Sequence, residues 1–177
     1  VKPKRPVPPG LVFEAGGRIG ADGTELEALD EADIRAAARA AKAAGVAAIA
    51  VCFLHAFANP AHERRALAIL AEEVPDLART ASVDVLPVVR EYERSMAAVL
   101  NAAVMPAISG YIARLEARLD DAGVVAPLLL MKSNGGVAGA AAIRRAPAQT
   151  ALSGPAAGVV GARAVCVAPV EIGAWAT

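Results

Sequence analysis

The residues best suited to ligand chemistry form a short polar turn, Ser133-Asn134-Gly135-Gly136, which follows the apolar segment 127–131. Two adjacent glycines let the backbone turn sharply and approach a ligand closely, because no Cβ atoms stand in the way. In open α/β sheets, ligands bind beyond the carboxyl ends of strands, which is where this turn falls. The pattern predicts a binding loop, or else a tight turn in which Asn134 caps the next segment.

A second glycine-bearing segment, Ser153-Gly154-Pro155, has the pattern of a helix start. Free N–H groups at a helix start can bind an anion. The helix also carries Gly154, Gly158 and Gly161, which leave it thin enough to pack closely against another backbone. Because small residues at this spacing are a weak binding signal, we favour close packing over anion binding.

The charged run at 90–95, Arg-Glu-Tyr-Glu-Arg-Ser, begins a long expected helix. An arginine at this place can hold a ligand carboxylate or phosphate through paired N–H groups, so Arg90 and Arg94 are candidate binding residues. The alternative is a solvated helix start in which arginines and glutamates pair at the surface, and this is the usual outcome for such a run.

Other chemistries find less support in the sequence. One cluster has the residue types of a metal site: Cys52, His55, His62 and Glu63. Because no second pair has ligand spacing, we expect no metal site there. An Asn-x-Gly-x-x-Gly pattern at 134–139 lacks the acidic residue of a dinucleotide fingerprint. No Gly-Lys-Ser/Thr loop and no nucleophile–base set stands out, so no catalytic residue is assigned.

Alternating apolar strands and amphipathic helices must position these residues. Strands are expected at 46–54, 83–89 and 127–131, after a hairpin around Asp22-Gly23. Helices are expected at 30–45, 60–75, 91–121 and about 155–165, with Asp30 as a cap and Pro106 as a kink or break. In the longest helix, apolar residues from Met96 to Leu119 recur at helical spacing. This order predicts an α/β fold, a mixed sheet with flanking helices.

The bulk composition fits one domain or one lobe of a larger protein. The chain has 177 residues, with 18 basic and 18 acidic side chains that cancel, which argues against nucleic-acid binding. We divide it into an extended lead-in (1–10), an α/β lobe (11–152) and an inter-lobe helix with the start of a next lobe (153–177). The absence of an apolar run of about 18 residues argues against a membrane span. Cys52 is expected to be a buried, reduced thiol, as in a cytoplasmic protein.

Four segments together resemble the hydantoinase A/5-oxoprolinase family, which includes N-methylhydantoinase A and acetone carboxylase subunits. They are Asn-Pro-Ala-His-Glu at 59–63, the charged run at 90–95, Met-Lys-Ser-Asn-Gly-Gly at 131–136 and Ser-Gly-Pro-Ala-Ala-Gly-Val at 153–159. Each segment is a weak signal alone, but the four in this order are specific. The resemblance covers about 7–165 and implies one lobe of an actin-like, ribonuclease H-like ATPase, in a central piece of a longer protein.

The resemblance also implies an activity for the whole protein, namely ATP-dependent hydrolysis of a cyclic amide such as a hydantoin or 5-oxoproline ring. ATP and a divalent cation would lie between two lobes, with Ser133–Gly136 facing the cleft. The helix that carries Gly154, Gly158 and Gly161 would cross between the lobes, where small residues permit closure. A second, hydantoinase B-like subunit or domain is the implied partner. The alternatives are a non-catalytic scaffold or subunit-contact lobe, and a ketone carboxylase subunit of the same family.

The chain departs from the family pattern in its phosphate loops. The Asp-x-Gly-Gly-Thr pattern does not occur in these 177 residues. Lys132 stands where the family usually has glutamine, while Met96 and Ala97 replace small hydroxyl residues. We therefore expect nucleotide binding to need the rest of the protein, and this chain alone to bind no cofactor tightly.

Overall fold

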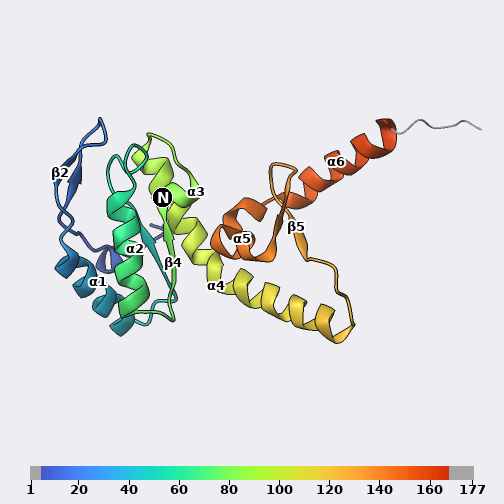
Figure 1. The fold of residues 1–177 in the computed structure, drawn as a ribbon, viewed down its shortest axis with the longest axis horizontal. Coiled ribbons are helices and arrows are strands. Elements are labelled where there is room, and N and C mark those ends of the chain that lie inside the picture. Colours follow the sequence, from blue (N-terminus) through green and yellow to red (C-terminus); the bar gives the residue numbers. More distant parts are fainter. Residues whose placement is uncertain (1–4, 168–177) are drawn as a thin grey trace, which may run out of the picture.

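The computed structural model describes residues 5–167, which form two parts joined by one long helix (Figure 1). The elements in chain order are η1 (Pro9–Leu11), β1 (Arg18–Ile19), β2 (Glu25–Glu27), α1 (Glu31–Ala43), β3 (Ala48–Val51), α2 (Ala61–Glu73), β4 (Ala78–Ala81), α3 (Ser82–Val85), α4 (Glu91–Asp121), β5 (Leu129–Met131), β6 (Val137–Gly139), α5 (Ala140–Arg145), η2 (Pro147–Thr150) and α6 (Ser153–Val167). We call residues 18–105 the sandwich and residues 129–150 the hairpin unit.

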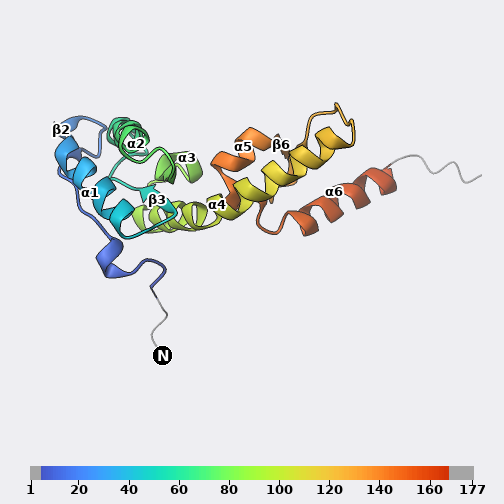
Figure 2. The same ribbon diagram turned by 90° about the horizontal axis from the view of Figure 1, so that it is seen from below.

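A parallel pair of strands forms the centre of the sandwich. β3 and β4 pair in register from Ala48 opposite Ala78 to Val51 opposite Ala81, and α2 makes the crossover between them. α2 contacts β4 and β3, while α4 contacts the same two strands, and Figure 2 shows the two helices on opposite sides of β3. This three-layer arrangement follows from the continuous apolar run around β3, which is typical of a strand covered on both faces.

Helices α1 and α2 pack against each other and close the core. Asp30 caps α1 as its sequence predicts, because its Oδ1 accepts hydrogen bonds from the backbone N–H groups of Ala32 (2.8 Å) and Asp33 (3.2 Å). The core consists of small and aliphatic side chains from α1, β3 and α2: Ile34, Ala38, Val51, Ala66, Ile69, Leu70 and Val74. Such a core depends on close spacing of backbones rather than on large side chains.

Helix α4 links the sandwich to the hairpin unit. It buries one stripe that includes two polar side chains: Arg94, Ala98, Asn101, Ala102, Met105 and Ile112. This stripe is not the apolar series noted in the sequence, since Leu100 and Tyr111 are exposed. Pro106 lies inside the helix without splitting it. By length and composition alone α4 could span a membrane, but its buried stripe packs on β3, β4 and the hairpin unit.

The hairpin unit is held to α4 by one buried amide side chain. Asn101 donates from Nδ2 to the Thr80 hydroxyl (3.1 Å) and to the Arg145 carbonyl (3.0 Å), and its Oδ1 accepts from the Ala148 N–H (3.1 Å). Within the unit, β5 and β6 form an antiparallel pair, as do β1 and β2 in the sandwich. The mixed α/β class is therefore confirmed, and the three strand pairs are separate two-stranded sheets within residues 5–167.

Two expectations from the sequence are wrong. The predicted strand at 83–89 is absent, because strand β4 ends at Ala81 and the chain turns directly into helix α3 at Ser82. Cys52 is exposed rather than buried, since β3 has a strand neighbour on one side only.

Candidate functional site

The carboxyl end of β3 is held by two buried charged side chains. The N–H of Phe53 donates to Glu63 Oε1 on α2 (2.9 Å), and the carbonyl of Phe53 accepts from Arg94 Nη2 on α4 (2.5 Å). Both side chains are fully buried, at 0% exposure. One peptide segment therefore joins a carboxylate from one helical layer to a guanidinium from the other.

Glu63 also organises the chain after β4. Its Oε1 accepts from the Ser82 hydroxyl (2.6 Å), and its Oε2 accepts from the Val83 N–H (3.1 Å). These contacts satisfy the first turn of α3, where backbone N–H groups have no partner within the helix. The carboxylate thus ties the ends of β3 and β4 together and explains why residues 82–85 are helical.

Arg94 is a buried cation with unused hydrogen-bonding capacity. Among residues 5–167, no group accepts from its Nε or Nη1. Its guanidinium carbon lies 5.9 Å from the centre of the Phe57 ring, which is within reach of a cation–π contact. Unpaired buried donors on a charged group are costly. The guanidinium is therefore suited to an anionic group that reaches this end of the sheet.

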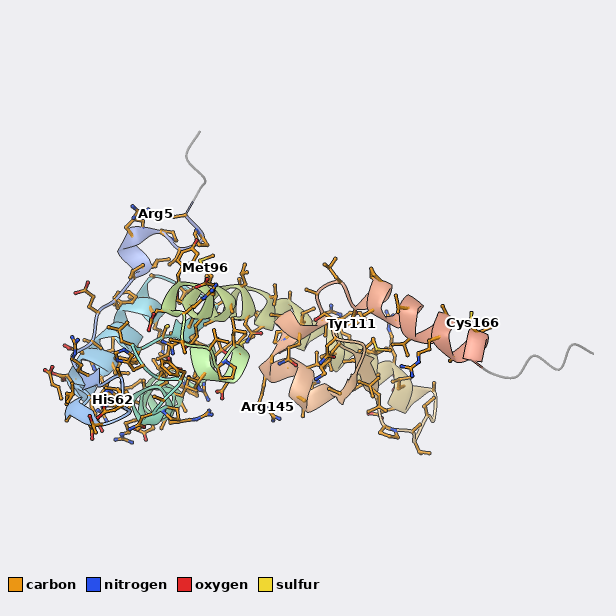
Figure 3. The ribbon with its side chains drawn as sticks, turned by 90° about the horizontal axis from the view of Figure 1, so that it is seen from above. Arg5, His62, Met96, Tyr111, Arg145 and Cys166 are labelled. Atoms are coloured by element: carbon orange, nitrogen blue, oxygen red, sulfur yellow. The ribbon has the colours of Figure 1, made fainter. Side chains whose placement is uncertain are left out.

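Both histidines contact the β1–β2 hairpin, His55 from the loop that follows β3 and His62 from the first turn of α2. His55 has a positive φ of 55° and its Nδ1 lies 2.9 Å from the Ile19 carbonyl. His62 is buried, and its Nε2 lies 2.8 Å from Glu25 Oε1. A positive φ at a residue other than glycine is uncommon and occurs often at functional sites. Figure 3 shows His62 within the sandwich, far along the molecule from Tyr111 and Cys166.

The predicted binding loop Ser133–Gly136 forms the tight turn between β5 and β6. Asn134 Oδ1 accepts from the Gly136 N–H (3.0 Å), and Gly135 has a φ of 81°. Ser133 donates to the Gln149 carbonyl from both its N–H and its hydroxyl, each at 2.7 Å. This geometry matches the turn in which Asn134 serves as a cap. Ligand binding by these exposed residues stays a prediction.

The structure places the two glycine-bearing segments side by side. A Cβ atom added to Gly135 would lie 3.2 Å from Cγ2 of Val160 on α6. The predicted close packing through Gly154, Gly158 and Gly161 is nevertheless not found within the described residues, since nothing lies within 4 Å of a Cβ at any of the three. Contact with the turn comes instead from a valine, and the glycine positions of α6 face open space.

The predicted binding residues Arg94 and Ser133–Gly136 do not form one site within residues 5–167. Arg94 lies in the first turn of α4, whereas Tyr111 and Ile112 line a cavity of about 200 Å³ beside β5 and the start of α6. Tyr111 lies 17 positions after Arg94 in the same helix, a distance of about 25 Å at 1.5 Å per residue. Arg90 is exposed and pairs with Glu93 at 3.3 Å, which is the surface arrangement left open by the sequence.

Glu63 is the residue of this site whose role the sequence analysis does not identify. The sequence places it only in a cluster whose spacing argues against a metal site, whereas in the structure it accepts hydrogen bonds from Phe53, Ser82 and Val83. Its signal is a charged residue on the buried stripe of a helix, one turn before Ala66 and two turns before Leu70. A charge at such a position needs buried partners.

Comparison with known proteins supports one family over nearly the whole chain. The hydantoinase/oxoprolinase model matches residues 94–172, and the model of the N-terminal region of the same family matches residues 2–74. The caprolactamase alpha subunit of Pseudomonas jessenii is 37% identical over 150 residues, which make up 85% of this chain and 22% of that protein. The chain therefore spans about a fifth or less of the length of the curated relatives that it matches.

Two solved structures share the fold. The crystal structure of ATP-dependent caprolactamase from Pseudomonas jessenii matches with a TM-score of 0.83 and 36% identity, covering 90% of this chain and 23% of that one. The nucleotide-free structure of acetone carboxylase matches with a TM-score of 0.69 and 30% identity, covering 85% of this chain and 22% of that one. The similarity confirms the predicted α/β lobe of an actin-like ATPase.

Proposed function

Because the chain belongs to the hydantoinase/oxoprolinase family, we propose that it forms part of an enzyme that uses ATP to hydrolyse a cyclic amide. The observation that carries this proposal is the likeness to ATP-dependent caprolactamase, which is the stronger of the two structural matches. Caprolactam, hydantoin and 5-oxoproline all contain an amide within a ring, so the shared chemistry defines the substrate class.

The chemistry explains why ATP is needed. Water attacks an amide carbonyl slowly, because the nitrogen lone pair delocalises into the carbonyl group and weakens it as an electrophile. Transfer of the γ-phosphoryl group to the amide oxygen makes the carbon more electrophilic and turns that oxygen into part of a leaving group. Water then adds to the carbon, and the carbon–nitrogen bond breaks as the nitrogen takes up a proton, which opens the ring and leaves an acyl phosphate. A second water attacks the acyl carbon, and phosphate leaves with the oxygen that came from the amide.

The described residues supply the frame of such a site rather than the phosphate loop. The carboxyl ends of β3 and β4, where open α/β sheets bind ligands, carry the buried Arg94 guanidinium and its unpaired N–H groups. Neither an Asp-x-Gly-Gly-Thr loop in the chain nor a metal-binding cluster in residues 5–167 is available to hold nucleotide or cation. In the proposal, both are held with the help of the rest of the protein.

The proposal includes a second subunit and a cytoplasmic location. Support for the subunit comes from the relative named as an alpha subunit. The exposed glycine positions of α6 offer a surface against which another lobe or subunit can pack closely. We retain the inter-lobe role of α6 on this basis.

The test is ATP hydrolysis by the full-length protein with a panel of ring amides: caprolactam, hydantoin and 5-oxoproline. The proposal expects at least one of them to stimulate phosphate release together with ring opening, and the isolated 177-residue chain to be inactive. Matched open-chain amides serve as controls. No stimulation by any of the three ring amides would remove ring opening as the function.

Ketone carboxylation is the second candidate, and the acetone carboxylase match favours it. It differs in substrate, since a ketone and bicarbonate would stimulate ATP hydrolysis instead of a ring amide. Acetone or acetophenone with bicarbonate therefore completes the panel. Stimulation by a ketone alone among these compounds would replace the first candidate with the second.

A further inference from the structure

The ring of His55 is fixed through one nitrogen and open at the other. Its Nδ1 lies 2.9 Å from the carbonyl oxygen of Ile19 on β1. Because a carbonyl oxygen only accepts hydrogen bonds, Nδ1 carries the proton, and the neutral ring keeps its lone pair on Nε2. His55 is half-buried, and within residues 5–167 no group hydrogen-bonds to Nε2, which reaches solvent. The ring is therefore held in the tautomer of a proton acceptor.

The backbone of the loop after β3 is ordered around this histidine. The His55 carbonyl accepts from the N–H groups of Ala58 (2.9 Å) and Asn59 (3.2 Å), which closes the loop into a turn. Asn59 donates from Nδ2 to the Gly23 carbonyl (2.9 Å), and its Oδ1 accepts from the Ala61 N–H (3.0 Å). These contacts hold His55 at a φ of 55°, a conformation that persists only where the surrounding structure enforces it.

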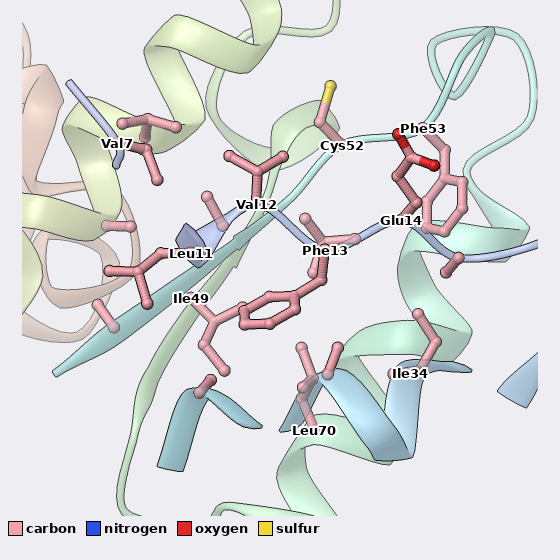
Figure 4. Close-up of a pocket in the computed structure, with 18 of the residues that line it drawn as sticks. Val7, Leu11, Val12, Phe13, Glu14, Ile34, Ile49, Cys52, Phe53 and Leu70 are labelled. Carbon is pink, nitrogen blue, oxygen red and sulfur yellow. The ribbon is translucent and has the colours of Figure 1, made fainter. Parts of the chain in front are cut away.

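The start of the same loop is fixed at Phe53. Figure 4 shows Cys52 and Phe53 where the chain leaves β3, with their side chains on opposite sides of the backbone. The Phe53 ring meets the His62 ring edge to face, at 5.8 Å between ring centres. Its N–H and carbonyl are bound by Glu63 and Arg94. Both ends of the loop are therefore set before a substrate arrives, which is a condition for precise placement of a reacting group.

Phe57 is a shared neighbour of His55 and the buried Arg94. Its ring lies edge-on to the His55 ring, at 6.2 Å between ring centres, and Arg94 Cζ lies 5.9 Å from its centre. The guanidinium has no acceptor for Nε and Nη1 among the described residues. A proton acceptor and a cation suited to a negative oxygen thus lie near one another at the carboxyl end of a strand, the edge where open α/β sheets bind ligands.

Two neighbouring groups are unsuited to accept a proton from a substrate. Glu63 is 0% exposed, and its two oxygens already accept three hydrogen bonds from the protein. His62 is buried, with Nε2 2.8 Å from Glu25 Oε1 and Nδ1 shielded from solvent. Of these three side chains, His55 is the one with an accessible lone pair.

We propose that His55 is a catalytic residue of the ring-opening reaction, and this inference rests on the proposed function. Nε2 takes a proton from the water whose oxygen bonds to the activated amide carbon. The imidazolium then gives that proton to the ring nitrogen. As the carbon–nitrogen bond breaks, its electron pair stays on nitrogen, the remaining hydroxyl proton passes to solvent, and the carbon becomes the carbonyl of the acyl phosphate. His55 ends the step neutral.

His55→Asn separates catalysis from loop structure. Asparagine tolerates a positive φ, and its side-chain N–H can donate to the Ile19 carbonyl as Nδ1 does, but nothing replaces Nε2. In the full-length protein with ATP and a ring amide, the variant should lose at least about 100-fold in kcat and keep KM within about threefold. Its circular dichroism and Tm should match those of the wild type.

His55→Gly provides a second measurement through chemical rescue. Glycine accepts the backbone conformation and leaves the space of the ring empty. Imidazole added to this variant should raise kcat about 10-fold, because it restores a proton acceptor near the position of Nε2. The same imidazole should not accelerate the wild type, which serves as the control.

The outcomes distinguish this assignment from the proposed function. An active wild type with an equally active His55→Asn variant would overturn the assignment alone. Loss of activity in both variants without rescue by imidazole would give His55 a structural role, which also overturns it. A wild-type protein that opens none of the ring amides would refute the proposed function and the assignment together.

Discussion

Replacing Glu63 tests whether one buried carboxylate holds the ends of β3 and β4 together. Glu63→Ala removes the acceptor of three hydrogen bonds, from Phe53 N–H, the Ser82 hydroxyl and Val83 N–H. Arg94 keeps its own hydrogen bond to the Phe53 carbonyl in this variant. Each buried donor left unpaired costs about 1–3 kcal/mol.

The expected loss of unfolding free energy is about 3–5 kcal/mol, the range for breaking a buried charged network. This lies in the lower part of the roughly 3–9 kcal/mol that three unpaired donors would sum to, because water can enter the space left by the side chain. For a domain of this size it lowers Tm by about 6–20 °C. Glu63→Gln should cost about 1–3 kcal/mol, since Oε1 can still accept while the new amide group faces the Val83 N–H.

The assay is urea unfolding of the wild-type chain and the variants, followed by circular dichroism. Glu72→Ala is the control, since the Glu72 side chain is 61% exposed and reaches Arg35 only at 3.9 Å; it should change stability by less than about 0.5 kcal/mol. Amide exchange at Phe53 and Val83 should accelerate in Glu63→Ala. A loss below about 1 kcal/mol, or equal effects of the two alanine substitutions, would refute the role given to Glu63.

Three further predictions concern other contacts. Asn101→Ala should lower the free energy of unfolding by about 2–4 kcal/mol, because three hydrogen bonds between α4, β4 and the hairpin unit are lost. Thermal unfolding measures this loss, and limited proteolysis at 129–150 should become faster. Gly135→Ala should cost about 1–2 kcal/mol, since φ is 81° and Val160 lies 3.2 Å from the new Cβ, whereas Gly139→Ala, with nothing within 4 Å, should be nearly neutral. The hydrogen bonds from Arg65 and then Arg35 lower the pKa of Glu31 to about 2, from an ordinary value of 4.5. The stabilisation that these hydrogen bonds to Glu31 give the folded chain is therefore complete above about pH 4.5 and is lost as the pH falls toward 2. Wild type and Glu31→Gln should differ in unfolding free energy at about pH 6 and converge near about pH 2.

The sequence was informative where local chemistry decides the structure. Asp30 marks the start of α1 because a carboxylate at that position accepts from the first free N–H groups of the helix. The Asp22-Gly23 pair predicts the β1–β2 hairpin, and Gly23 takes a φ of 84° there. Pro106 did not break α4, because tertiary packing of the long helix on the sandwich and the hairpin unit outweighs one lost hydrogen bond.

Contacts between distant residues decided the rest. The four valines within 83–89 favour a strand, but the carboxylate of Glu63, about 20 residues earlier, satisfies the first turn of α3 instead. On α4 the series from Met96 to Leu119 suggested the buried face, whereas the helix buries Arg94 and Asn101, whose partners lie 21 to 47 residues away. Periodicity records side-chain polarity but not the partners that make a buried polar group stable.

The arginines and the glycine turn show the same limit at the candidate site. Arg90 and Arg94 look alike in the sequence, yet one is exposed and paired with Glu93 while the other is fully buried at the end of β3. The contact between the turn at Gly135 and the helix at Val160 joins the two glycine-bearing segments, as expected if they border a shared region. Their separation from Arg94 along α4 could not be inferred from spacing alone.

The most direct test of ATP-driven ring opening follows one oxygen atom. The full-length protein is supplied with ATP and a ring amide that carries ¹⁸O at its carbonyl, and the inorganic phosphate is examined by mass spectrometry. If the amide oxygen receives the phosphoryl group, the phosphate released should contain one ¹⁸O atom for each ring opened. Ring opening that leaves all of the label in the product carboxylate, or phosphate release without ring opening, would contradict the account.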